Sequence, residues 1–193
     1  MKVDFKTVVL GRHIEFKYYK EYGLESSVVG LDSNLTKNAG TERWFENHFL
    51  MIDYDDNLSL NNLINEVKRL QEKFSLPDAY IFESSYRHYN VVFFGVCRDY
   101  FDCLKIIHDT PCCESFKSWR MIRQEMTIRM SPKLNEKPPV LVYVVLSDIG
   151  EYDEHIADNF IIKQEIDSIR KFVLYNCPAK LPKGQNYRME VKV

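Results

Sequence analysis

The chain has 193 residues, of which 45% are hydrophobic and 28% are charged. This length and composition suit one globular domain that needs no disulfide or metal to be stable, and we expect residues 1–193 to form a single domain. The formal net charge of −2 excludes binding to nucleic acid through an overall positive field, although a local basic face is compatible with a neutral total.

Cysteine usage and apolar runs indicate the compartment. The five cysteines are odd in number and include no C-x-x-C pair, which predicts reduced thiols. The N-terminus has no signal-peptide pattern, and the longest apolar run, at 140–146, is far shorter than the roughly 20 residues of a membrane span. We therefore expect a cytoplasmic protein with no membrane association.

The first third of the chain contains one clear helix. Residues 3–10 are strand-like, whereas 23–42 are rich in Gly, Ser, Asn and Thr and are expected to be loop. Residues 44–52 end in an apolar run of strand length. A helix is predicted over 60–74, because apolar residues recur on one face, with Ser59 or Asn57 as the N-cap.

The remaining elements alternate between the two types. Strands are predicted at 79–82 and 89–97, and the polar link ESSYRH between them is typical of a hairpin. The pattern then predicts helices at 98–108 and 114–122, strands at 126–130 and 140–146, a helix at 156–172 and an edge strand at 186–193.

The order from 49 to 130 is therefore β-α-β-β-α-β. This order predicts an α+β fold of the ferredoxin-like or RRM-like kind, in which an antiparallel sheet carries helices on one face. The core would span about 45–146, with N- and C-terminal additions. The other face of the sheet is expected to stay open for a ligand.

Two carboxylates follow the apolar strand at 44–52. Asp53 and Asp55 alternate with Tyr54, so in a strand both lie on one face, about 6 to 7 Å apart at Cα. Such a pair usually needs a metal, a proton or an arginine between its members. It suits Mg²⁺ or Mn²⁺, which take further ligands from substrate phosphates in two-metal nucleotidyl transfer. The alternative is a polar turn or a helix cap.

The predicted hairpin concentrates polar groups in one turn beside that strand. Hydroxyl and backbone N–H donors there can hold phosphate oxygens, with an arginine as counter-charge. The alternative is an ordinary hydrophilic hairpin with a surface histidine. The candidate phosphate-binding residues are Ser84, Ser85, Arg87, His88 and Asn90.

A basic segment follows at 117–137, with six basic and two acidic side chains. In a strand, Thr127, Arg129 and Ser131 share a face, which would direct Arg129 to the same place as Asp53 and Asp55. The rival account is a structural ion pair between Arg129 and those aspartates. Lys133 is a candidate nucleotide-binding residue together with Arg129, and the candidates for contact with nucleic acid are Lys117, Arg120, Arg123 and Lys137.

Together, FLMIDYDD, YIFESSYRHYNVVFF and MTIRMSPKLNEKPP resemble the archaeo-eukaryotic primase and primase-polymerase superfamily, especially its small plasmid and virus replication members. The resemblance lies in order and spacing over about residues 45–146. It implies that Asp53 and Asp55 are ligands of Mg²⁺ or Mn²⁺, and that the turn carrying Ser84, Ser85 and His88 holds the phosphates of the incoming nucleotide.

The sequence departs from the family pattern at two points. The family histidine lies within the strand, in the register of Asn90, but His88 shares that strand face and either residue can reach the phosphates. The third motif is an aspartate near a turn resembling 129–133, and it is missing. The nearest acids are Glu125 before that turn and Asp148 after the last strong strand. Without a third acid the site would bind nucleotide but polymerise poorly or not at all.

The resemblance implies template-dependent nucleotidyl transfer in DNA replication, in which a 3′-hydroxyl attacks the α-phosphate of a nucleoside triphosphate steadied by Arg129 and Lys133. Single-stranded DNA is the implied template, and a helicase or another replication protein is a candidate partner. The first alternative is a catalytically weak or inactive single-stranded nucleic-acid-binding replication module that uses 117–137 and Trp119. The second is a metal-dependent nuclease or replication initiator, although the chain has no His-x-His pair.

Overall fold

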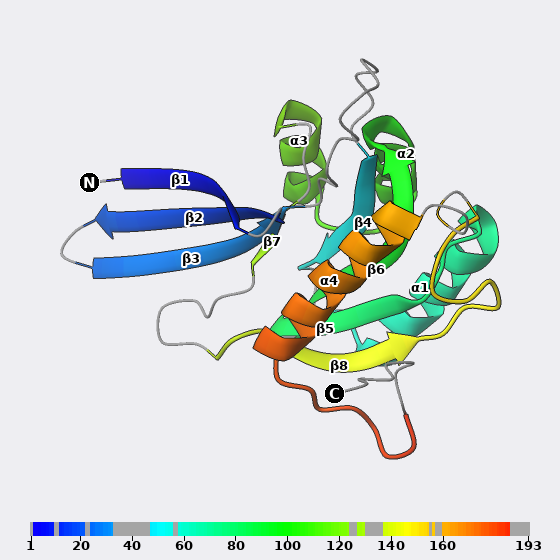
Figure 1. Cartoon of the computed structure of the whole chain (residues 1–193). Helices are drawn as coiled ribbons and strands as arrows, with labels where there is room; N and C mark the ends of the chain where they lie inside the picture. Colours follow the sequence, from blue (N-terminus) through cyan, green and yellow to red (C-terminus); the bar gives the residue numbers. More distant parts are fainter. Residues whose placement is uncertain are drawn as a thin grey trace.

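The computed structural model describes residues 2–9, 12–21, 24–32, 47–55, 58–123, 127–129, 137–154, 156 and 160–185. Within these ranges the strands form two four-stranded sheets, with the orders β1-β2-β3-β7 and β4-β6-β5-β8. The first sheet projects from the body of the molecule, and the second forms its centre (Figure 1).

The projecting sheet is built from the N-terminal strands and one short strand from later in the chain. All of its neighbouring strands are antiparallel: β1 (Lys2–Val9), β2 (Arg12–Glu21), β3 (Leu24–Asp32) and β7 (Thr127–Arg129). The loop expected over 23–42 is therefore wrong for 24–32. Composition there favours loop, but pairing with β2 and β7 satisfies the backbone of β3, and such non-local pairing outweighs local propensity.

The central sheet is a four-stranded antiparallel sheet in a mixed α+β fold, as expected. Its strands are β4 (Asn47–Tyr54), β6 (His88–Asp99), β5 (Ala79–Ser85) and β8 (Val140–Val145). The predicted strand at 126–130 is real but lies in the other sheet, as β7. The longer β-branched run of β8 takes the edge beside β5 instead.

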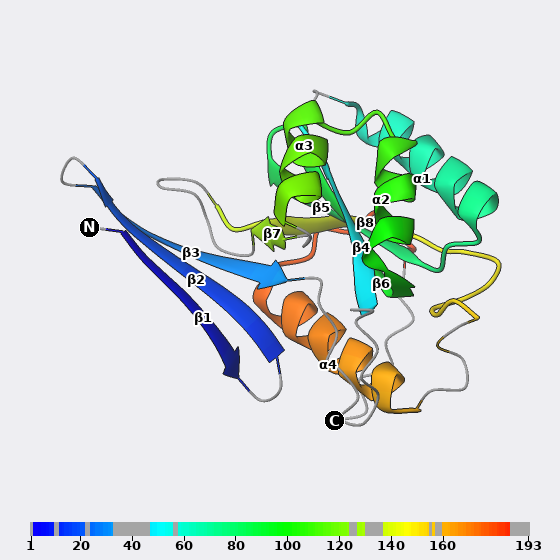
Figure 2. The same ribbon diagram turned by 90° about the horizontal axis from the view of Figure 1, so that it is seen from above.

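Helices cover both faces of the central sheet (Figure 2). On one face lie α1 (Leu60–Phe74), α2 (Tyr100–His108) and α3 (Glu114–Arg123), and on the other lies α4 (Phe160–Asn176). The expectation of helices on one face and an open second face is therefore wrong. The reason is visible in the strands, because 49–52, 79–82 and 91–96 are buried without alternation and need cover on both sides.

Helix boundaries follow their caps. Ser59 caps α1 by accepting from the Asn62 N–H at 3.3 Å, and the predicted helix over 60–74 is confirmed. Helix α2 begins two residues later than predicted because Asp99, the last residue of β6, serves as its N-cap. Helix α4 begins and ends later than predicted, and the tail at 186–193 lies outside the described residues.

A buried ion network attaches α4 to the sheet. The Arg170 guanidinium donates to Glu151 at 3.1 Å and to Asp167 at 2.8 Å, and it reaches the Tyr80 hydroxyl on β5 at 3.5 Å. The segment carrying Glu151 lies against β6, where the Asp153 N–H donates to the Gly95 carbonyl at 2.9 Å. These contacts close the face of the sheet that the sequence pattern suggested would be open.

Candidate functional site

The carboxylate pair lies where β4 leaves the core. Asp53 is the second-last residue of β4 and is half-buried. Tyr54 after it is buried, and Asp55 is exposed just beyond the end of the strand. Alternation along β4 puts the two carboxylates on the same side of the sheet as Met51. This is the side covered by α4, because Met51 pairs with Val92, Val92 pairs with Tyr80, and the Tyr80 hydroxyl meets Arg170 of α4. The sequence prediction of a shared face is consistent with this register.

The partner strand brings the histidine turn to the same place. Asp53 lies directly opposite Asn90 in the β4–β6 ladder, and opposite residues project from the same face. One step further, the Asp55 Oδ1 atom lies 3.0 Å from the His88 Nδ1 atom. The Asp55 and His88 side chains remain 44% and 35% exposed, so the pair is open to a ligand from solvent even though α4 covers the centre of this face.

The Asp55–His88 contact constrains the imidazole. An ionised carboxylate only accepts hydrogen bonds, so the Nδ1 atom of His88 carries the hydrogen in this contact. The Nε2 atom is then left for a ligand, and the carboxylate fixes both the tautomer and the ring orientation. A histidine held in this way can bind a phosphate oxygen when it is protonated or can exchange a proton with a bound group when it is neutral.

The turn itself is closed by its own side chains. The Ser84 hydroxyl donates to the His88 carbonyl at 3.3 Å, and Ser85 pairs with His88 at the end of the ladder. Arg87 does not join the Asp55–His88 pair: its guanidinium lies over the ring of Tyr86, 5.4 Å from the centroid. The serines therefore shape the turn, and the arginine charge is placed at its tip.

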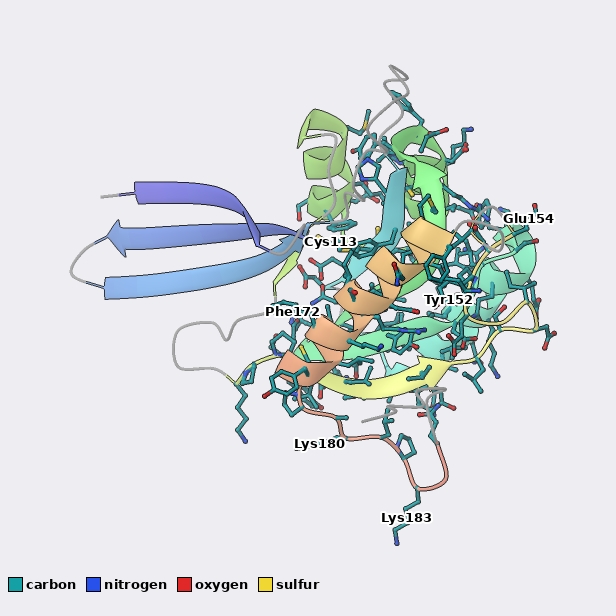
Figure 3. The ribbon with its side chains drawn as sticks, viewed as in Figure 1. Cys113, Tyr152, Glu154, Phe172, Lys180 and Lys183 are labelled. Atoms are coloured by element: carbon teal, nitrogen blue, oxygen red, sulfur yellow. The ribbon has the colours of Figure 1, made fainter. Side chains whose placement is uncertain are left out.

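Asp53, Asp55, His88 and Asn90 form one corner of the central sheet, and the sequence did not identify the segment leading into α3 as part of it. The Cys113 N–H donates to the Asp53 carbonyl at 3.4 Å, and the Cys113 Sγ atom lies 2.8 Å from the Ser115 hydroxyl. Figure 3 labels Cys113 on the side of the body where the projecting sheet begins. The available signal was the Pro111 stop before a new helix, which brings the chain back across the end of β4.

Asp53 and Lys117 of α3 are the charged side chains that act on the Cys112 thiol next to this corner. Burial is the main cause that raises the pKa of the Cys112 thiol, the charge of Asp53 acts in the same direction, and Lys117 opposes both. Lys117 is paired with Glu114 at 2.7 Å, and its side chain is only 11% exposed. Lys117 is thus poorly presented to a nucleic acid, in contrast to its expected role, but its charge lies near the site.

The structure describes the other predicted basic residues only in part. The backbone of Arg129 lies in β7 opposite Gly30, and β7 lies close to β4, but the Arg129 side chain is outside what the structure describes. The side chains of Arg120 and Arg123 on α3 are outside it too, as are Glu125 and Lys133 entirely. Lys137 is exposed ahead of β8.

Asp148 does not belong to this corner. Strand β8 runs antiparallel to β5, so it starts beside Glu83 and ends beside Ala79. Asp148 follows that end and lines a shallow groove of about 400 Å³ with Lys68 and Gln71 of α1. It therefore lies at the opposite end of the sheet from His88 and is excluded as the third acid.

Asp53 and Asp55 are the residues of this corner whose chemistry suits a divalent cation. Among the described residues, no three His, Cys, Asp or Glu side chains come together as a metal-binding group. Two same-face carboxylates nevertheless meet the minimum for Mg²⁺ or Mn²⁺, which is bound through one or two carboxylates and completes its shell with water and substrate phosphate. Asp53 and Asp55 fit an ion shared with a phosphorylated substrate, with His88 engaging only one oxygen of Asp55.

Comparison with known proteins adds no relative. The chain matches no protein-family model, no curated protein and no solved structure. Within the described ranges, none of the helices combines the length and the apolar character needed to cross a bilayer.

Proposed function

We propose that this corner is a nucleotidyl-transfer site of the primase-polymerase kind. One observation carries the proposal: Asp55 and His88, separated by 33 positions in sequence, are in contact at 3.0 Å, and the neighbouring Asp53 lies opposite Asn90. An acid-x-acid strand end and a serine-histidine turn thus share one face. These two elements are the ones that the family resemblance requires to be adjacent.

Each residue has a distinct role in the proposal. Asp53 and Asp55 would hold Mg²⁺ or Mn²⁺, which when bound lowers the pKa of the attacking 3′-hydroxyl and offsets charge on the α-phosphate. His88, oriented by Asp55, presents its Nε2 atom to the phosphates of the nucleoside triphosphate. Asn90 is buried and lies in register with Asp53, so its amide is fixed beside the acids rather than free to move.

The sheet face covered by α4 and the acid pair bear differently on the two alternative functions. A binding module that reads single-stranded nucleic acid on an open sheet face would need the face that α4 occupies, since Ile162, Ile166 and Val173 are buried against it. A metal-dependent nuclease could use the same acids, because phosphodiester hydrolysis and nucleotidyl transfer make similar demands on a metal site. The two chemistries are separated by their products.

The test is extension of a labelled primer on single-stranded DNA, with Mg²⁺ or Mn²⁺ and each class of nucleoside triphosphate. We expect a ladder of longer products from the wild type, and an Asp53→Asn/Asp55→Asn variant should lose incorporation by at least about 100-fold, since single electrostatic groups at reacting phosphates are worth that much. Asparagine keeps the side-chain shape and can still accept from His88, so the melting temperature should stay close to that of the wild type.

Asp148→Asn is the matched control, because it neutralises an exposed acid at the opposite end of the sheet and should extend the primer as the wild type does. Unchanged incorporation in the Asp53→Asn/Asp55→Asn variant would refute the proposed site. Shortened rather than lengthened primer, again dependent on the two acids, would replace polymerisation with strand cleavage.

A further inference from the structure

The tip of the β5–β6 hairpin presents an aromatic ring to solvent beside the candidate site. Ser85 pairs with His88, so Tyr86 and Arg87 form the connection between the two strands. Tyr86 is 77% exposed, in contrast to the buried aromatic residues of the strands that lead to it. The residue after the tip is His88, which contacts Asp55.

The backbone at Arg87 is in an unusual conformation. Its φ is 60°, in the left-handed region that glycine and asparagine occupy most easily in hairpin turns. The other described non-glycine residue with positive φ is Ser75, which closes helix α1, where this conformation is ordinary. Arg87 thus stands where glycine would be less strained, and strain of this kind at a residue other than glycine points to a use for its side chain.

The charge of Arg87 is available to a ligand. Among the residues that the structure describes, no carboxylate lies within ion-pair distance of its guanidinium, and the nearby Glu83 carboxylate accepts from the Arg87 backbone N–H at 3.4 Å instead. The guanidinium rests over the Tyr86 ring, which keeps the cation and the aromatic face next to each other. A flat ring beside an exposed cation matches the alternation of base and phosphate in a nucleic-acid strand.

We propose that Tyr86 and Arg87 form a contact for single-stranded nucleic acid. Tyr86 stacks on an unpaired base, and Arg87 binds the adjacent phosphate. This inference rests on the proposed function in one respect: the nucleic-acid strand bound by Tyr86 and Arg87 is taken to be the template or primer that reaches Asp53 and Asp55. A duplex would not fit this contact, because its bases are already stacked and paired.

The test is fluorescence anisotropy with a labelled single-stranded oligothymidine in EDTA without nucleotide, so that binding is measured apart from synthesis. Tyr86→Ala should weaken binding by about 5- to 150-fold, the loss expected for one base stack, and Tyr86→Phe should bind within about twofold of the wild type. The exposed position of Tyr86 predicts that both variants fold normally.

Arg87→Gly provides a second and independent test. It should weaken binding and reduce the slope of log K against log salt concentration by the amount expected for about one phosphate contact. Arg87→Lys should keep most of that slope. Because glycine suits a φ of 60°, Arg87→Gly should melt at the same temperature as the wild type or higher. Weaker binding together with undiminished stability would separate a contact with the ligand from a structural role.

Wild-type protein that fails to bind the oligonucleotide at about 50 mM salt would overturn the inference, and so would Tyr86→Ala that binds as tightly as the wild type. The proposed function fails separately. If binding depends on the tip but the wild type extends no primer, the contact stands without nucleotidyl transfer. If extension depends on Asp53 and Asp55 but binding ignores the tip, the site stands without this contact.

Discussion

Gly95 provides a sharp test of how the segment after β8 packs against β6. A Cβ atom built on Gly95 would lie 1.8 Å from the Glu151 carbonyl oxygen, and 2.9 Å from the Tyr152 Cα atom. Carbon and oxygen atoms in close protein contacts are ordinarily about 3.3 Å apart, so this backbone would have to withdraw by about 1.5 Å. Both obstacles are main-chain atoms, so no rotation of a side chain can relieve them.

The expected cost of Gly95→Ala combines three effects. Overpacking costs about 1 to 3 kcal/mol, and withdrawal of the segment breaks the 2.9 Å hydrogen bond from the Asp153 N–H to the Gly95 carbonyl, which contributes about 1 kcal/mol. The lower entropy of the unfolded alanine chain offsets about 0.4 to 1 kcal/mol. We therefore expect a loss of roughly 2 to 3 kcal/mol in the free energy of unfolding.

Thermal unfolding followed by circular dichroism measures this effect. For a chain of this length, 1 kcal/mol corresponds to about 2 to 4 °C, so the melting temperature should fall by roughly 4 to 12 °C. Gly184→Ala is the matched control: nothing lies within 4 Å of its Cβ, so only its φ of +86° opposes alanine, at about 1 kcal/mol. A Gly95→Ala protein that melts within 2 °C of the wild type would refute the packing of this segment against β6.

Two further predictions follow from the thiols and from an ion pair between helices. In the folded protein a thiol reagent such as DTNB should modify Cys113 first, because the other four cysteines are buried and burial raises the pKa of Cys177 to about 11; rapid loss of two or more thiols would contradict this. Lys73 and Arg69 hold the pKa of Asp109 below its ordinary value, so Asp109 stabilises the fold above about pH 4 and loses this effect as the pH falls through its folded pKa. The gap in melting temperature between wild type and Asp109→Asn should therefore shrink below about pH 4, and a constant gap down to pH 2 would disprove the ion-pair account.

Local features of the chain were predictable from the sequence. Helix α1 has the predicted bounds because its apolar period, its Ser59 cap and the Pro77 stop are all local signals within residues 59–77. Strands β4, β5, β6 and β8 were also predicted close to their positions, since β-branched and aromatic runs between turn residues depend on neighbours in sequence. The same local rule put Asp53 and Asp55 on one face of β4.

The arrangement of those elements depended on contacts between distant parts of the chain. Composition alone suggested a loop at 24–32, but pairing with β2 and β7 makes it β3. The unbroken apolar runs of β4 and β6 were a signal that both faces are covered, but the sequence pattern did not say that α4 supplies the second cover. Strand order is decided by which buried faces can be satisfied together, and this cannot be read from spacing along the chain.

The candidate site shows the same division. The sequence by itself determined that an acidic pair stands at the end of one strand and that a serine-histidine turn precedes another. Only the tertiary structure decided that the β4–β6 register joins Asp55 to His88, that Asp148 lies at the far end of the sheet and that the Cys113 backbone contacts Asp53. The physical reason is that side-chain types are chosen residue by residue, whereas strand pairing sets the distances between them.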